Sequence, residues 1–176
     1  MHDGTLRRAL MTETRDLHDT LDREVGVFGD AAAYGAFLTG SHGFRAAIEP
    51  SLLQDAGWQV DPLVPLIARD LADLGLPVPP AADPLPLPTP AARAAACYVL
   101  EGSALGGRLL ARRAAALGYT ADHGARHLAA QTASNTRWRR FLEWLEAGDF
   151  PAAEAGAAAR DVFALALRSY GPRAVA

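Results

Sequence analysis

Residues 89–118 read TPAARAAACYVLEGSALGGRLLARRAAALG and decide the fold class. Thr89 followed by Pro90 is typical of a helix start, because threonine caps free amide groups and proline fits the first helical position. Alanine and leucine favour helix over most of the stretch, and Gly118 is a helix stop. We therefore expect a long helix from Pro90 to about Leu117. Since no alternating strand pattern of useful length occurs elsewhere, the sequence predicts an all-α fold.

The rest of the chain predicts five further helices, over residues 4–25, 30–53, 61–75, 121–146 and 151–169. Asp30 is the expected N-cap of the second of these helices, and Asp61 followed by Pro62 is expected to open the third. The many prolines between residues 76 and 90 exclude a helix there. Neither half of the chain is long enough to form a good core alone. Residues 1–176 are therefore expected to form a single domain with 76–90 as an internal connector.

The composition excludes several classes of protein. The chain has 176 residues, of which 50% are hydrophobic and 21% charged, a balance that is incompatible with disorder as the main state. Its one cysteine, Cys97, rules out a disulfide framework and a cysteine-rich zinc site. A net charge of -3 argues against a general binder of nucleic acid or of membrane surfaces. With no secretory signal and no apolar run long enough to span a membrane, we expect a soluble cytoplasmic protein.

His18 is the first candidate for chemistry. It lies within the first predicted helix, next to an apolar stripe that includes Leu17 and Leu21, and Arg15 lies three residues before it. Asp22 follows four residues later and therefore lies on the same helix face. One interpretation is a partly buried histidine whose ring nitrogens are satisfied locally. The other is an axial metal ligand, since neutral imidazole commonly binds metals and a carboxylate one turn away can orient it.

The second candidate is the segment EGSALGG, from Glu101 to Gly107, in the interior of the long helix. Its glycines cost about 1 kcal/mol each relative to alanine, which this chain uses freely. Gly102 and Gly106 lie one turn apart and share a face. Either these small residues allow close helix–helix contact, or a flat ligand lies directly against the helix backbone, where a Cβ would collide. Glycine also allows the helix to bend over such a ligand.

Two further patterns are less specific. His123 and His127 have a spacing that can bind zinc, but no third ligand and no general-base glutamate accompany them, so we do not expect a metal site there. The run RWRRF at residues 137–141 mixes basic and aromatic residues. It has three interpretations: a nucleic-acid contact, a solvated helix face with aromatic anchors, or an arginine that pairs with a ligand carboxylate. The solvated face is favoured because the run is short and lies on a predicted helix.

A histidine on the first helix and a glycine-rich later helix resemble the two faces of a heme-binding sandwich. On these residues the chain resembles the bacterial heme oxygenases, in particular the small branch with a Gly-Ser-x-Leu-Gly motif, whose members serve iron acquisition or accompany bacteriophytochromes. The resemblance extends over nearly the whole chain. Its most specific parts are TRDLHDTLD at residues 14–22, YVLEGSALGG at 98–107, HGARHLA at 123–129 and RWRRF at 137–141.

The resemblance implies roles for individual residues. His18 is expected to be the proximal iron ligand, with Asp22 as its acidic neighbour. The hydroxyl of Tyr98 is expected to meet a heme propionate. The distal helix that covers the heme is implied to include four residues of the glycine segment, namely Gly102, Ser103, Gly106 and Gly107.

Two positions depart from the pattern of relatives. The basic residue that precedes the proximal histidine by seven positions, a propionate partner in relatives, is Met11 here. Arg8, Arg15 or Arg139 is expected to take over that contact. The mammalian-like branch has an aspartate at the position of Ser103, whereas the small bacterial branch has a serine there, as this chain does. The resemblance does not identify which groups hold the distal water.

The implied function is that of a heme oxygenase. Such an enzyme cleaves heme b, its substrate and cofactor, with O2 and reducing equivalents, and yields biliverdin, Fe2+ and CO. A ferredoxin or flavin reductase is the expected electron donor, and a bacteriophytochrome is a candidate recipient of biliverdin. The alternative is a non-catalytic heme carrier or sensor on the same fold. A more distant alternative, a protein of this fold that handles another small molecule, is disfavoured by the combination of His18 with Gly102 and Gly106.

Overall fold

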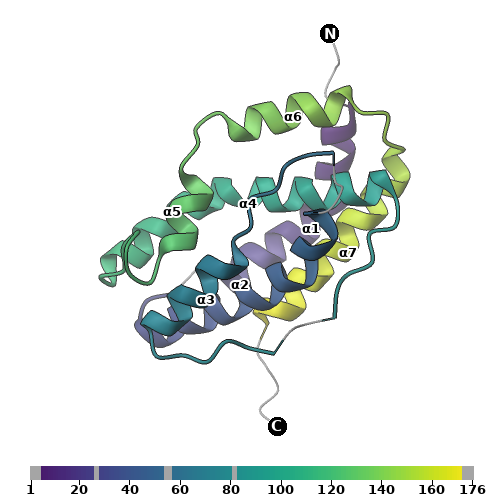
Figure 1. Cartoon of the computed structure of the whole chain (residues 1–176). Coiled ribbons are helices and arrows are strands. Elements are labelled where there is room, and N and C mark those ends of the chain that lie inside the picture. Colours follow the sequence, from purple (N-terminus) through teal and green to yellow (C-terminus); the bar gives the residue numbers. More distant parts are fainter. Residues whose placement is uncertain (1–4, 26–27, 54–56, 81–82, 172–176) are drawn as a thin grey trace.

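The structure is a computed structural model that describes residues 5–25, 28–53, 57–80 and 83–171. Over these residues it has seven helices and no β-strand, which confirms the predicted all-α fold. The helices are α1 (Thr5–Val25), α2 (Ala31–Leu52), α3 (Val64–Asp73), α4 (Pro90–Ala116), α5 (Arg126–Thr132), α6 (Arg137–Ala147) and α7 (Ala152–Tyr170) (Figure 1). Gly4, the first residue of the helix predicted over residues 4–25, lies outside the described residues. None of the described helices has the length and apolar character that a membrane crossing requires.

Two helices begin where their local caps predict. The Asp30 carboxylate accepts a hydrogen bond from the Ala33 amide at 2.8 Å, and the Thr89 hydroxyl accepts one from the Ala92 amide at 3.1 Å. Both amides belong to the first turn of a helix, where no intrahelical partner exists. The predicted starts of α2 and α4 are therefore confirmed.

The predicted start of the third helix at Pro62 is wrong, because α3 begins at Val64. The Glu49 carboxylate, on α2, accepts hydrogen bonds from the amides of Leu63 at 3.0 Å and Val64 at 3.2 Å. A buried side chain from another helix therefore takes the place of the local cap expected from Asp61.

The single helix predicted over residues 121–146 is also wrong, because the structure has two helices here, α5 and α6, with a turn between them. The Ser134 hydroxyl accepts hydrogen bonds from the amides of Thr136 at 3.3 Å and Arg137 at 3.1 Å. A serine that bonds to nearby amides competes with helix continuation and favours a new helix start. The beginning of the predicted segment is a loop in which Gly124 has a φ of 77°, a conformation that other residues rarely adopt.

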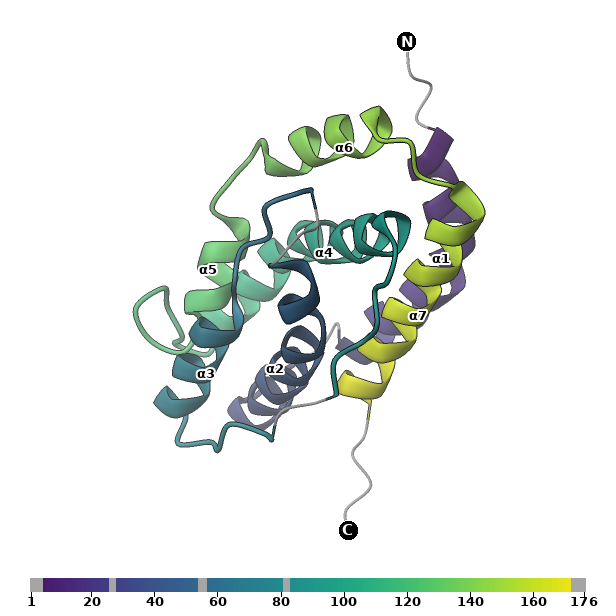
Figure 2. The ribbon, with the colours of Figure 1, turned by 45° about the vertical axis from the view of Figure 1, so that its right-hand side comes forward.

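Helix α7 holds the two candidate site helices in place. It packs against α1, α4 and α2, and Figures 1 and 2 show it running alongside α1. The small, fully buried side chains of Ala155 and Ala159 on α7 and of Ala95 on α4 allow the helices to approach closely. Because α7 contacts both α1 and α4, it fixes the helix that carries His18 relative to the helix that carries Gly106.

Candidate functional site

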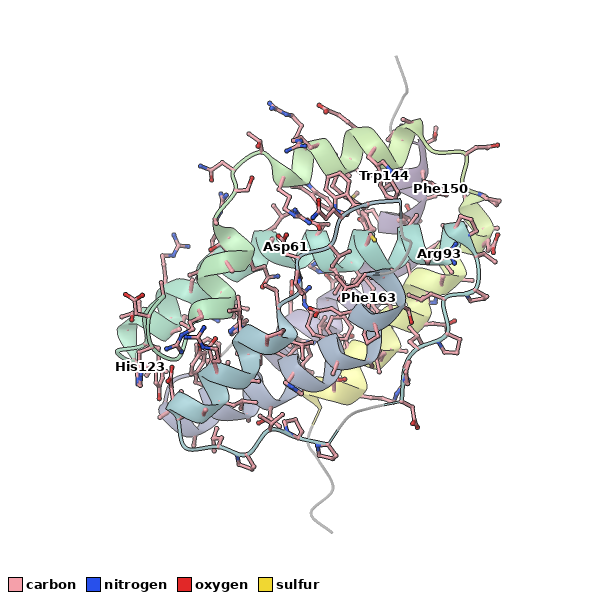
Figure 3. All side chains as sticks on the ribbon, in the orientation of Figure 1. Asp61, Arg93, His123, Trp144, Phe150 and Phe163 are labelled. Carbon is pink, nitrogen blue, oxygen red and sulfur yellow. The ribbon has the colours of Figure 1, made fainter. Side chains whose placement is uncertain are left out.

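The imidazole of His18 is accessible on α1. Its side chain is 59% exposed, and Nδ1 lies 3.3 Å from Oδ2 of Asp22. The ring centroid is 5.9 Å from that of Phe163, a buried residue of α7 that Figure 3 labels. Met11, two turns before His18 on the same face, is 45% exposed. A carboxylate beside Nδ1 favours the proton at that nitrogen and leaves the lone pair of Nε2 for a ligand.

One face of α4 exposes apolar side chains and bare backbone. Tyr98, Gly102, Leu105, Gly106 and Leu109 share this face because they follow one another at helical spacing. Leu105 is 58% exposed and Leu109 44%, high values for large apolar side chains in the middle of a helix. We call these five residues the α4 face. An exposed apolar face of this kind indicates a binding surface for an apolar partner.

The three glycines of the EGSALGG segment have different surroundings. A Cβ added to Gly106 would have no neighbouring atom within 4 Å, whereas one added to Gly102 would lie 3.6 Å from the Trp138 ring. A Cβ added to Gly107 would lie 3.1 Å from Cγ2 of Thr132 on α5, which is a tight contact. Close helix packing therefore explains Gly107, while Gly106 leaves the helix backbone open to a ligand.

The hydroxyl of Ser103 already has two partners within the protein. It donates a hydrogen bond to the Leu100 carbonyl oxygen at 2.6 Å and accepts one from Nε2 of Gln131 at 2.6 Å. The hydroxyl has a single proton, and that proton takes part in the hydrogen bond to Leu100 within α4. Ser103 thus fixes α4 to α5 and does not present a free donor.

Tyr98 lies half-buried at one end of the α4 face, with its ring 5.7 Å from that of Trp138. Burial raises the pKa of its hydroxyl, and the positive charge of Arg7 on α1 opposes that rise. Of the arginines considered from the sequence, Arg15 is exposed on α1, and Nε of the exposed Arg139 lies 3.8 Å from Glu143.

The two histidines at zinc-binding spacing have separate environments. His127 is buried, and its Nδ1 lies 2.8 Å from Oδ2 of Asp70. His123 is 59% exposed and lies 3.5 Å from Asp73, and Figure 3 places it at the opposite end of the molecule from Trp144. Among the described residues no group of three metal-binding side chains occurs.

Sequence reasoning missed the burial of four charged residues on α2, α3 and α4: Arg45, Glu49, Asp70 and Glu101. The sequence indicates this burial only weakly. Each residue is a charged one within an apolar periodic stretch, and a charged residue there is equally compatible with a solvent-exposed position. Arg45 and Glu49 are four residues apart on α2, and their side chains lie 3.4 Å apart. Such a pair is normally a surface pair, and only the packing of other helices over α2 buries it.

The fold and site define an all-α protein in which an accessible imidazole and an apolar, glycine-containing helix face are available to a ligand. No family model matches the chain. It is 37% identical over 123 residues to a heme oxygenase of Xanthomonas campestris pv. campestris, a match that covers 66% of this chain and 74% of that protein. Its structure matches the NO- and CO-bound heme oxygenase from Neisseria meningitidis with a TM-score of 0.78 and 29% identity, over 97% of this chain and 94% of that chain. The chain therefore belongs to the heme oxygenase family.

Proposed function

We propose that this heme oxygenase binds heme b between α1 and α4, with His18 as the ligand of the iron. The observation that carries the proposal is the α4 face, where the backbone at Gly106 is bare and Leu105 and Leu109 are exposed. A flat, largely apolar ring fits such a face, and a neutral imidazole whose Nδ1 faces Asp22 presents Nε2 to the iron.

Bound heme supplies the iron centre and the ring that is cleaved to biliverdin, Fe2+ and CO with O2 and reducing equivalents. The residues of the chain orient this substrate and control access to it. Asp22 keeps the His18 proton on Nδ1 and so preserves Nε2 as a ligand. The α4 face has no carboxyl group, and the Ser103 hydroxyl already donates its hydrogen bond to the Leu100 carbonyl oxygen. We propose that protons reach the Gly106 end of this face through water.

The direct test is to mix the protein with heme and a reductant in air and to follow the Soret band and the absorbance of biliverdin. We expect the Soret band to disappear as biliverdin forms. A Soret band that persists under these conditions would identify a carrier or sensor instead. Family membership favours the enzyme.

We propose Arg7 as the basic partner of a heme propionate. Arg7 lies on α1, one helical turn before Met11, the position where relatives carry the basic residue, and its positive charge opposes the rise in the Tyr98 pKa that burial causes. It joins Arg8, Arg15 and Arg139 as a candidate, and its place one turn before Met11 on α1 favours it.

Tyr98→Phe is expected to weaken heme binding by about 0.5–1.5 kcal/mol, the net contribution of one hydrogen bond. The ring remains packed on Trp138, so the fold is expected to be unchanged. The measurement is heme transfer to an excess of an unrelated heme-binding protein. Tyr119→Phe, in the loop after α4, is the control. Equal heme retention by both variants would remove Tyr98 from the heme site.

Gly106→Ala is expected to stabilise the heme-free protein and to impair turnover. Alanine in a helix interior is favoured over glycine by roughly 1 kcal/mol, and no atom lies near the added methyl group. With heme bound, the methyl group would occupy space on the heme side of α4. Thermal melts of the heme-free and heme-loaded forms, together with biliverdin formation, measure both effects.

Gly107→Ala is the matched control on the neighbouring residue. Its methyl group would press on Thr132 at 3.1 Å, so it is expected to gain less stability than Gly106→Ala does. If Gly106→Ala instead melts lower without heme and still degrades heme normally, Gly106 is a packing residue and α4 is not the distal helix.

Finer features of the function follow from the resemblance to the Gly-Ser-x-Leu-Gly branch. We propose that a ferredoxin or flavin reductase supplies electrons and that the protein acts in the cytoplasm. Its purpose is then either iron release or supply of biliverdin to a bacteriophytochrome. A phytochrome gene beside the gene for this protein would support the second purpose.

A further inference from the structure

Glu101, which directly precedes Gly102, is the one carboxylate on α4, and it accepts three side-chain hydrogen bonds. Its side chain is 7% exposed. Oε2 accepts a hydrogen bond from Nε of Arg137 at 2.7 Å, and Oε1 accepts one from Nη2 of Arg137 at 2.6 Å and one from Nε1 of Trp58 at 2.9 Å. This two-point arginine–carboxylate pairing is the strongest and most directional form of ion pair.

Arg137 in turn joins α4 to two other parts of the chain. It is the first residue of α6, and its Nη2 also donates to the Gln59 carbonyl oxygen at 2.6 Å. Its guanidinium lies 5.4 Å from the centre of the Trp58 ring, and Nη1 lies 3.4 Å from Asp61, which Figure 3 shows beside α4. The ion pair borders a hollow of about 20 Å³, room for a single water molecule, and the Glu101 side chain is 7% exposed while that of Arg137 is 25% exposed.

The helix segment that follows Glu101 depends on such neighbours for its position. Gly102, Gly106 and Gly107 have no side chains and weaken the helix by about 1 kcal/mol each. The residue after Arg137 is Trp138, whose ring faces Gly102 at 3.6 Å from the position of an added Cβ. The start of α6 therefore contacts the glycine segment through both an ion pair and an aromatic ring.

We propose that the Glu101–Arg137 ion pair sets the position of the glycine segment of α4 over the heme, and thereby influences which meso carbon is cleaved. Arg137 is a positioning residue that acts through Glu101 and the α4 backbone. The inference rests on the proposed function, in which α4 covers the heme.

The first measurement is amide hydrogen exchange of the heme-free protein, which does not depend on heme. Arg137→Gln is compared with Arg126→Gln, a matched variant because Arg126 is the first residue of α5 and pairs with the buried Asp70 at 3.2 Å. In Arg137→Gln the amides of residues 103–107 are expected to exchange about tenfold faster than in Arg126→Gln, after correction for global stability. Equal exchange of these amides in the two variants would overturn the proposal.

The second measurement is the ratio of biliverdin isomers from the heme-loaded enzymes. Arg137→Gln is expected to change this ratio by about twofold or more, because small misplacements at a reacting centre have large kinetic effects. Arg126→Gln is expected to keep the wild-type ratio. A wild-type ratio in Arg137→Gln would overturn the positioning role even if its amides exchange faster.

Arg137→Lys keeps the charge but loses the two-point geometry, so its isomer ratio is expected to lie between those of wild type and Arg137→Gln. If Arg137→Gln does not fold, Arg137→Lys takes its place in both measurements, and a wild-type ratio in Arg137→Lys would then overturn the proposal.

Failure of the wild-type protein to form biliverdin is a separate result that contradicts the proposed function, whereas the exchange experiment tests the ion pair without heme.

Discussion

His18→Ala is expected to abolish biliverdin formation while leaving a folded protein that still binds heme weakly. The side chain is 59% exposed, so its removal costs little packing energy. If His18 is the iron ligand as proposed, its removal deprives the iron of that nitrogen, although the apolar α4 face remains. Because even the partners of metal ligands contribute 10–100-fold to activity, loss of the ligand itself is expected to lower turnover by more than about 100-fold. Electron paramagnetic resonance or resonance Raman spectra of the ferric complex report the loss of the axial nitrogen.

His123→Ala is the matched control for this prediction. His123 has the same 59% exposed side chain and a similar carboxylate neighbour, Asp73 at 3.5 Å, but lies on the loop after α4. Its removal is expected to leave both the spectrum and the turnover unchanged. Unchanged axial ligation in His18→Ala would refute the assignment of His18 as the iron ligand.

Asp70→Ala is expected to have the largest effect on stability. Asp70, on α3, is fully buried and accepts hydrogen bonds from the amides of Arg126 and His127, both at 3.0 Å, and from the His127 ring at 2.8 Å. Removing one partner from a buried charged network typically costs about 3–5 kcal/mol. For a chain of this size, that corresponds to a fall in melting temperature of roughly 6–20 °C.

Asp83→Ala, at an exposed position in the proline-rich connector, is the control and is expected to melt within about a degree or two of wild type. Thermal and urea unfolding of the heme-free proteins measure the difference. A similar melting temperature for Asp70→Ala and Asp83→Ala would show that Asp70 does not hold α5 against α3.

The same network is expected to make the fold sensitive to acid. Burial lowers the pKa of His127 below the ordinary 6.5, so protonation favours the unfolded chain and stability falls as the pH drops below about 6.5. Burial alone would raise the pKa of Asp70, but hydrogen bonds from His127 and Arg126 outweigh it and hold the pKa below its usual range. The stability that Asp70 contributes is therefore present above its unfolded pKa and is lost only at lower pH. Unfolding free energies that do not decrease between pH 7.5 and pH 5 would contradict this prediction.

The sequence by itself determined the helical class and the features that depend on close neighbours in the chain. The starts of α2 and α4 follow from Asp30 and Thr89, whose side chains cap amides three residues away. The pairing of His18 with Asp22 follows from their spacing on one helix. These features could be predicted because helical geometry places residues a few positions apart at known distances.

The tertiary structure decided the features that depend on residues distant in the chain. Glu49 of α2 sets the start of α3. Only the structure shows that Gly106 has open space beside it whereas Gly107 packs on Thr132, because their positions in the sequence do not distinguish the two glycines. Arg137 could be read as a partner of a ligand carboxylate until the fold brought it to Glu101, 36 residues away. Each of these contacts joins separate helices, and its geometry depends on how those helices pack, which no local pattern of residues encodes.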